Sequence, residues 1–489
     1  MKRKITEEFE EWRKSPIDQA LLVKGCRQIG KTYSIREFAE RSYRNVVYID
    51  FEEHPEYGSL FSEGTDADSF LENLGYTEFG NLLVPGETVI VLDEIQACEP
   101  AFSALKPLVL DGRYDYIASG SLLGVDLSDR LRSPMGYVRI VEMHPMDFEE
   151  FLWANGIGEA QTENVRRHIR DMTPFTEFQL SKLHELFLRF LVIGGMPQAV
   201  KSYVETRNYA DVAKVFSDLL TVLRRDAMRY SPKEDRMRIS ACLDSIPMQL
   251  AKENNTFSYH DIQGLRGVGR NVYGSSIDWL IGSGIAMKVS NVSEPREPLA
   301  RNVKERSFKI YMADTGLLTF MTGPGIAGKI VSGDRSVNNG AVMENAVAVM
   351  LLQNGYDPFF FQKSNSTLEI DFIISGPDGP IAIEVKSGRY DYPKSLITVM
   401  SERNGVDKGI LLAEENIRTD DYGVIHLPLF APCFLEPAGC SDVPPVDDVD
   451  RLNKELGRSI PDGSERSDSV GTCISIYQLT LLRSKAVFA

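Results

Sequence analysis

A short segment near the N-terminus has glycines, a lysine and a hydroxyl side chain at the spacing that binds phosphate. It fits G-x-x-x-x-G-K-[ST] at every required position and consists of Gly25, Cys26, Arg27, Gln28, Ile29, Gly30, Lys31 and Thr32. The glycines let the backbone curl so that successive amides point at phosphate oxygens, and a helix that begins near Lys31 adds its positive N-terminal end. We expect Lys31 to reach the β- and γ-phosphates of ATP and Thr32 to bind Mg2+.

A second segment places two carboxylates directly after an apolar strand. The apolar run at 88–92 is followed by Asp93 and Glu94. We expect Asp93 to hold the magnesium ion through water and Glu94 to polarise the attacking water. Ser119 directly follows the next predicted strand, where a polar side chain can sense the γ-phosphate. The pattern therefore favours ATP hydrolysis, with ATP and Mg2+ as cofactors, over nucleotide binding alone.

A third set of charged residues lies far along the chain, where Asp371 is followed by Glu384-Val385-Lys386 in the pattern D-x12-E-x-K. Residues two apart on a strand share a face, so Glu384 and Lys386 should point the same way. Asp371 shares this face if it lies on a neighbouring strand with the same orientation. In that arrangement magnesium can be held by the carboxylates of Asp371, Glu384 and Glu344. Lys386 can then orient or deprotonate a water. The alternative is the solvated face of an ordinary hairpin.

The elements that carry these residues follow from the pattern of apolar residues. Residues 1–146 alternate short apolar runs with helical stretches, which is typical of an α/β fold with a parallel sheet. The predicted strands are 20–24, 45–51, 87–92, 114–118 and 137–143. Between 147 and 231 apolar residues recur at helical spacing and predict a helical subdomain.

The remainder divides into three predicted parts. Residues 232–325 read as a winged helix, because two short helices precede two strands that flank a charged loop. The predicted elements are helices at 258–265 and 271–285 and strands at 288–292 and 308–312. Residues 326–435 predict an α/β domain, and 436–489, which open with a stretch rich in Pro, Asp, Gly and Ser, predict a disordered tail. The α/β elements are a helix at 341–353 and strands at 357–362, 367–375 and 380–386.

Net charge limits the possible partners. The chain has 70 acidic and 54 basic residues, a formal charge of -16, so DNA binding needs a local basic patch. The segment 231–310 has an excess of basic residues, including Arg266, Arg270 and Arg301, and is the candidate DNA contact; an ordinary solvated face is the alternative. We expect no membrane partner and a cytoplasmic location, because no apolar run approaches the roughly 18 residues of a membrane helix and no secretory signal opens the chain.

These motifs together resemble a widespread bacterial and archaeal family of AAA-type ATPases. The matching segments are GCRQIGKT at 25–32, LDEIQ at 92–96, SGSLLG at 119–124, HPMDFEEF at 144–151, GGMP at 194–197, DTGLL at 314–318 and EN at 344–345. The resemblance covers residues 5 to 432 and implies an AAA-like P-loop domain. It also implies a characteristic C-terminal domain of unassigned function, which resembles the PD-(D/E)XK restriction-endonuclease-like fold and would use Asp371, Glu384 and Lys386.

The chain departs from the family pattern at two places. Many relatives have Gly-Arg where this chain has Gly136-Tyr137, so Arg130, Arg132 or Arg139 would have to contact the γ-phosphate instead. Ile370 stands where the nuclease pattern has proline.

Two functions stay open. The first is an ATPase whose cycle drives a winged helix and a nuclease-like domain that act on or near DNA. The second is a regulatory protein in which ATP switches conformation and the C-terminal fold binds a protein partner, or a second copy of the chain, without cutting. The presence together of Glu344, Asp371, Glu384 and Lys386 favours the first, and the acidic net charge favours the second.

Overall fold

The computed structural model describes residues 1–61, 65–121, 136–231, 235–262, 269–334, 339–363, 368–388, 392–401 and 405–435. All of them belong to one compact unit, Met1–Ala438, whereas the unit Gly439–Ala489 lies outside the described residues. The predicted disordered tail, 436–489, therefore falls outside the described structure as well.

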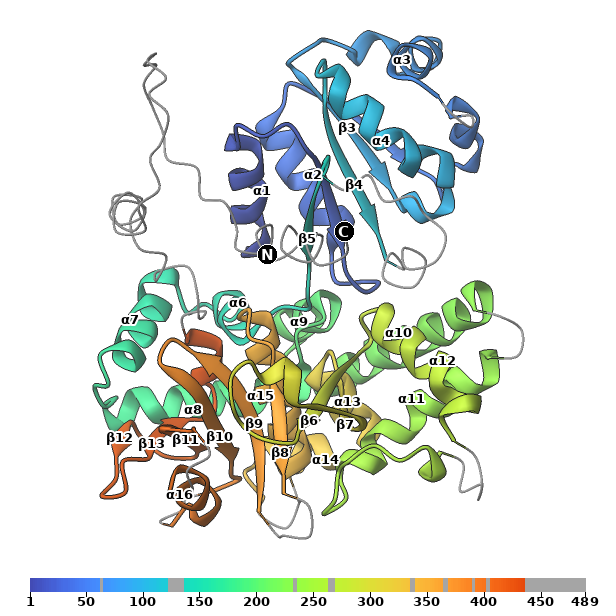
Figure 1. The fold of residues 1–489 in the computed structure, drawn as a ribbon. Coiled ribbons are helices and arrows are strands. Elements are labelled where there is room, and N and C mark those ends of the chain that lie inside the picture. Colours follow the sequence, from blue (N-terminus) through green and yellow to red (C-terminus); the bar gives the residue numbers. More distant parts are fainter. Residues whose placement is uncertain are drawn as a thin grey trace, which may run out of the picture. The chain divides into compact units, whose positions relative to one another are not determined.

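Five parallel strands form the sheet of the N-terminal part, in the order β2-β3-β4-β1-β5 (Figure 1). They are β1 (Ala20–Lys24), β2 (Asn45–Asp50), β3 (Thr88–Asp93), β4 (Asp115–Gly120) and β5 (Val138–Glu142). The predicted parallel α/β sheet is thus confirmed, and each strand lies within one or two residues of its predicted position. Because β4 pairs with both β1 and β3, the loops that follow these three strands meet at one edge of the sheet.

Helices cover both faces of this sheet, which explains why its strands are apolar without alternation. Leu21 and Val23 of β1 pack in the same cluster as Phe9 and Phe38, which belong to α1 and α2, whereas Leu22 packs in the cluster of α3 and α4. The helices are α1 (Ile5–Lys14), α2 (Lys31–Ser42), α3 (Ala67–Gly75) and α4 (Glu99–Asp111), with short 3-10 helices η1 (Pro55–Leu60), η2 (Gly80–Leu82) and η3 (Ile95–Ala97).

Helices dominate the chain from residue 148 to 282, as the apolar spacing predicted for its first half. They are α6 (Phe148–Ala154), α7 (Glu159–Arg170), α8 (Glu177–Ile193), α9 (Pro197–Thr206), α10 (Tyr209–Tyr230), α11 (Arg236–Leu250) and α12 (Arg270–Gly282). The break between α8 and α9 requires glycine, because a Cβ on Gly195 would come within 1.9 Å of the Met146 carbonyl oxygen and Gly194 has a φ of +67°.

A mixed sheet of eight strands follows, in the order β12-β13-β11-β10-β9-β8-β6-β7 (Figure 1). Its strands are β6 (Ala286–Val292), β7 (Val303–Met312), β8 (Phe359–Gln362), β9 (Glu369–Gly376), β10 (Gly379–Val385), β11 (Lys408–Ala413), β12 (Arg418–Thr419) and β13 (Ile425–Pro428). The other elements of this part are α13 (Thr315–Thr322), α14 (Ile326–Val331), α15 (Gly340–Gln353), α16 (Lys394–Ser401), η5 (Leu299–Asn302) and η6 (Ala431–Phe434).

The hairpin predicted as a wing is part of this larger sheet. β6 pairs in parallel with β8, with Ser290 beside Phe359 and Val292 beside Phe361, so β6 and β7 continue the C-terminal sheet. The helix predicted at 258–265 is described only as the 3-10 helix η4 (Tyr259–Asp261), and residues 263–268 lie outside the described structure. Within the described ranges, no helix is long and apolar enough to cross a membrane.

Candidate functional site

The segment 25–32 forms a tight loop between β1 and α2, and its two glycines are required by the backbone. Gly25 has a φ of +155°, and a Cβ there would lie 2.2 Å from the Met143 carbonyl oxygen. Gly30, with a φ of +91°, is the N-cap of α2, and no side chain of the described structure caps that helix. The first amides of α2 are therefore available to an anion, as in a phosphate-binding loop.

The Lys31 side chain lies within this loop and is only 5% exposed. Its Nζ donates to the carbonyl oxygens of Gly25, at 2.9 Å, and Cys26, at 3.0 Å. Burial lowers the pKa of Lys31, while the nearby Glu94 carboxylate acts in the opposite direction. The ammonium is thus held inside the loop by two of the loop's own carbonyl groups.

Asp93 is the centre of a hydrogen-bonded group at the carboxyl edge of the sheet. The Thr32 hydroxyl donates to Asp93 Oδ2 at 2.9 Å. The hydroxyls of Ser119 and Tyr48 also donate to the Asp93 carboxylate. The structure therefore brings together Thr32, Asp93 and Ser119, and it adds Tyr48, which the motifs did not reveal. Burial, followed by the Asp93 charge, raises the pKa of Tyr48, so its hydroxyl remains a donor.

Glu94 adjoins this group and is held by two side chains. Its backbone has a φ of +51°, which is uncommon for a residue other than glycine and often marks a functional position. Its Oε2 accepts from Gln96 Nε2 at 2.5 Å and from Ser121 Oγ at 3.0 Å. Gln96 and Ser121 lie inside segments that the sequence analysis singled out, but only the folded structure shows that they contact Glu94.

A cavity of about 1130 Å3 opens beside the loop and is lined by Lys31, Thr32 and Glu94 as well as by residues of α9 and α10. This volume is large enough for a nucleotide, since ligand sites commonly measure about 300–1,000 Å3. The loop amides and Lys31 suit phosphate, and the Thr32 and Asp93 oxygens are the hard donors that Mg2+ prefers. These residues therefore fit Mg2+ and ATP.

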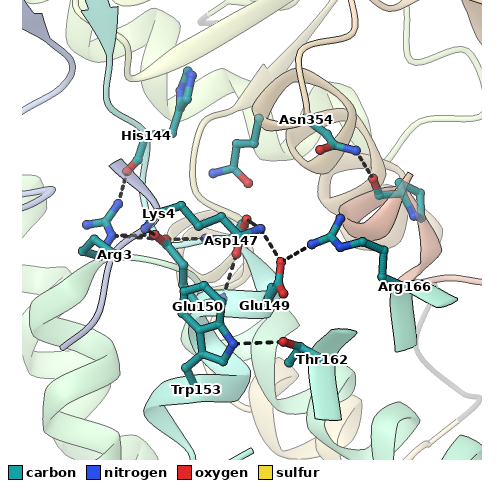
Figure 2. A network of polar contacts seen from close by, with 12 residues as sticks. Arg3, Lys4, His144, Asp147, Glu149, Glu150, Trp153, Thr162, Arg166 and Asn354 are labelled. Atoms are coloured by element: carbon teal, nitrogen blue, oxygen red, sulfur yellow. Dashed lines mark hydrogen bonds and ion pairs between the residues drawn. The ribbon is translucent and has the colours of Figure 1, made fainter. Parts of the chain in front are cut away.

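Arg3, in the segment that precedes α1, contacts the phosphate loop, and Figure 2 shows its further contacts with His144 and Glu150. Its guanidinium donates to the Ile29 carbonyl at 2.8 Å, to the His144 carbonyl at 2.7 Å and to both carboxylate oxygens of Glu150 at 3.1 Å. Lys4 adds ion pairs to Asp147, at 2.5 Å, and to Glu149, at 2.6 Å. Sequence reasoning missed this role; its one sequence signal was the basic start Lys2-Arg3-Lys4.

Of the three arginines considered for the γ-phosphate, Arg139 lies in the described part of the chain. Arg139 pairs with Glu8, at 3.8 Å, and Glu11, at 3.3 Å, of α1 and does not line the cavity. Arg130 and Arg132 lie outside the described residues.

The predicted C-terminal residues meet in a second cavity, of about 280 Å3, which Glu344, Asp371, Glu384 and Lys386 line together. β9 and β10 are antiparallel with Phe372 beside Ile383, so Asp371 and Glu384 occupy the next facing positions. Lys386 Nζ lies 2.7 Å from Glu384 Oε1.

A lysine that the sequence analysis did not consider lies among these carboxylates. Lys309 is 0% exposed, and its Nζ lies 2.9 Å from Glu344 Oε1 and 3.0 Å from Glu369 Oε1. Burial, followed by the charge of Glu344, raises the pKa of Asp371 to about 7, although Lys309 and Lys386 act against this shift. Within the described residues, no group of three or more His, Cys, Asp or Glu side chains is arranged to hold a metal ion.

Two of the three arginines named for the candidate DNA patch lie in the described part of the chain. Arg270 begins α12 and Arg301 lies in η5, and both are exposed. Arg266 lies outside the described residues.

Comparison with known families agrees with the geometry of the first site. Residues 18–152 match the AAA domain family. Together with the parallel sheet and the P-loop, this match identifies the N-terminal part as an AAA-type P-loop ATPase domain. Residues 184–325 and 339–430 each match a domain of unknown function, DUF8612 and DUF4143. No curated protein matches the chain.

Several solved structures are similar at low identity. A Walker-type ATPase of Pyrococcus abyssi is 16% identical, with a TM-score of 0.40, over 65% of this chain and 95% of that one. The ORC1 protein of Aeropyrum pernix, in complex with DNA, is 13% identical, with a TM-score of 0.25, over 68% of this chain and 91% of that one. The RuvB Holliday junction branch migration motor of Thermotoga maritima is 13% identical, with a TM-score of 0.25, over 58% and 86%.

Proposed function

We propose that this chain binds Mg2+ and ATP at the loop 25–32 and hydrolyses ATP with Glu94 as the water-orienting residue. The observation that carries the proposal is the hydrogen-bonded group in which Thr32 and Ser119 donate to Asp93 beside Glu94. The oxygens of Thr32 and Asp93 would hold Mg2+, which neutralises phosphate charge when bound. Lys31 and the first amides of α2 bind the phosphates.

Glu94 is well placed to accept a proton or a hydrogen bond from water. Gln96 and Ser121 fix the direction of its carboxylate, which is what a group that orients a nucleophile needs. Ser119, fully buried, fixes Asp93 in the same way.

Replacement of Lys31 tests nucleotide binding. Lys31→Ala removes the ammonium that faces the phosphates, so ATP affinity should fall by about 100-fold, in line with the loss of a charged hydrogen bond of ~1.5–3 kcal/mol. Calorimetric titration of the full chain with Mg2+ and ATP measures this. Lys14→Ala, on the exposed side of α1, is the matched control and should bind as the wild type does. Equal binding by Lys31→Ala and the wild type would contradict the proposal.

As a second candidate, we propose a metal-dependent nuclease-like activity for the C-terminal cavity, carried by charged side chains within residues 326–435. Its support is that Asp371, Glu384 and Lys386 share this cavity and that Glu384 Oε2 is buried without a hydrogen-bond partner in the described structure. Glu344 would join them as a ligand of Mg2+ if it left Lys309. Phosphodiester hydrolysis would use Asp371 and Glu384 to hold the metal and Lys386 to orient the water.

A nicking assay on plasmid DNA with Mg2+ or Mn2+, together with calorimetry of Mn2+ binding, tests this activity. Asp371→Ala should lose both metal binding and nicking, whereas Asp378→Ala, in the exposed turn between β9 and β10, should keep both. A wild-type protein that neither binds Mn2+ nor nicks DNA would instead favour the alternative, a protein switched by ATP whose C-terminal part binds a partner. If residues 232–325 contact DNA, the same protein preparation should bind DNA, and its affinity for DNA should fall steeply as salt is added.

A further inference from the structure

Arg27 connects the phosphate loop to three other elements. Its guanidinium donates to Ser121, which follows β4, at 3.3 Å. It also pairs with Glu52, after β2, at 2.6 Å and with Asp226, in α10, at 3.2 Å. Since Ser121 also donates to Glu94, one hydroxyl group separates the Arg27 guanidinium from the carboxylate that orients the water.

We infer that Arg27 recognises the terminal phosphate of a nucleoside triphosphate, and that it exchanges Asp226 for this phosphate when the triphosphate binds. The inference rests on the proposed function of the loop 25–32. Arg27 lies within that loop and lines the cavity beside Lys31 and Glu94. The water that Glu94 orients must attack the terminal phosphate, so a guanidinium this near to Glu94 is also near to that phosphate.

The chemistry of the side chain suits this role. An arginine guanidinium is always charged and binds phosphate oxygens through two parallel N–H donors, which makes it more selective for phosphate than an ammonium. Arg139, on β5, is paired with α1 and does not line the cavity. Arg27 thus provides, from the loop itself, a charge at the cavity that Arg139 does not.

Asp226 competes with a bound terminal phosphate for the Arg27 guanidinium. It is 6% exposed, and its Oδ2 has no hydrogen-bond partner among the described residues. A phosphate placed next to this buried carboxylate would be repelled, so the phosphate and Asp226 compete for the same guanidinium. Because Asp226 belongs to α10, the exchange releases that helix from the loop. A nucleoside diphosphate has no terminal phosphate and would leave the Arg27–Asp226 pair in place.

Titration of the full chain with ADP and with a non-hydrolysable ATP analogue, both with Mg2+, tests the exchange. Arg27→Ala should weaken analogue binding by about 10- to 100-fold and change ADP binding by less than about threefold, as expected for one charged contact. Asp226→Asn should strengthen analogue binding by about 5-fold, in the range of ordinary coupling between sites. Asp218→Asn, on an exposed position of the same helix, is the matched control and should change neither.

Hydrogen exchange adds a measurement that does not depend on hydrolysis. In the wild type, α10 amides near Asp226 should exchange faster with the analogue than with ADP, and Arg27→Ala should abolish this difference. Equal losses of ADP and analogue binding in Arg27→Ala, or unchanged analogue binding in Asp226→Asn, would overturn the inference and leave the proposed function intact. A wild type that binds neither nucleotide would overturn the proposed function, and the inference with it.

Discussion

Gly25 shows how closely single residues constrain the phosphate loop. A Cβ at this position would lie 2.2 Å from the Met143 carbonyl oxygen and 2.6 Å from Ile29 Cδ1, and the φ of +155° disfavours other residues. The closer of these two clashes is with backbone, which cannot rotate away. We predict that Gly25→Ala lowers the free energy of unfolding by about 2–4 kcal/mol, as substitutions at strained positions do, and also weakens ATP binding.

Thermal unfolding of Gly25→Ala beside Gly328→Ala measures this effect. Gly328 lies in α14 with open space around its added Cβ, so its replacement should change stability by no more than about 1 kcal/mol and in the stabilising direction. A Gly25→Ala protein as stable as the wild type would show that the loop can adopt another backbone path.

Sequence alone predicted those residues of the proposed nucleotide site that belong to local motifs. Lys31, Thr32, Asp93 and Glu94 follow from spacing along the chain, and the structure places them beside one cavity or hydrogen-bonded to each other. Their supporting residues did not follow in this way. Tyr48, for example, reaches Asp93 only because β2 pairs with β3. That pairing cannot be predicted from the sequence of either strand alone. The roles of Arg3, Ser121 and Asp226 were missed because their contacts also join segments that are distant along the chain.

At the scale of elements, the segment before α1 is joined to α6 through a buried ion pair and to the phosphate loop through a hydrogen bond from Arg3 to the Ile29 carbonyl. The side chains of Arg3 and Glu150 are 7% and 5% exposed. Removing one partner leaves the other charge buried without compensation, which costs about 3–5 kcal/mol. We therefore predict that Arg3→Met lowers the free energy of unfolding by about that amount, and that adding Glu150→Met recovers much of the loss.

Chemical denaturation of the two variants, with Lys2→Ala as the control, checks this prediction. Lys2 pairs with Glu159 at the surface, with both side chains about half exposed or more, so its loss should cost less than about 1 kcal/mol. Equal effects of Lys2→Ala and Arg3→Met would refute the role assigned to Arg3.

The prediction of elements was accurate where it depended on local periodicity. Strands of the first sheet and the helix at 340–353 lie where the apolar pattern put them. The pattern could not show which strands are neighbours. The hairpin of β6 and β7 was assigned to a separate winged helix, yet β6 pairs with β8, nearly 70 residues later in the chain. Such pairing depends on side-chain packing between distant segments, which periodicity does not encode.

At the scale of the whole molecule, the two charged cavities differ in the groups that contact their carboxylates and balance the negative charge. In the proposed nucleotide site, Asp93 accepts hydrogen bonds from hydroxyl groups, which do not neutralise its charge. In the C-terminal cavity, Lys309 and Lys386 pair directly with carboxylates. We therefore expect the nucleotide site to bind Mg2+ with its nucleotide, and the C-terminal cavity to bind a divalent cation only where that cation competes with an ammonium group.

The most direct test of this account compares ATP turnover by the wild type and by Glu94→Gln under single-turnover conditions with Mg2+. Glutamine keeps the size of the side chain and removes its ability to act as a base. The account predicts that the wild type forms ADP and that Glu94→Gln binds ATP as tightly but hydrolyses it at least about 100-fold more slowly. Turnover by Glu94→Gln at the wild-type rate, or no ADP from the wild type, would contradict it.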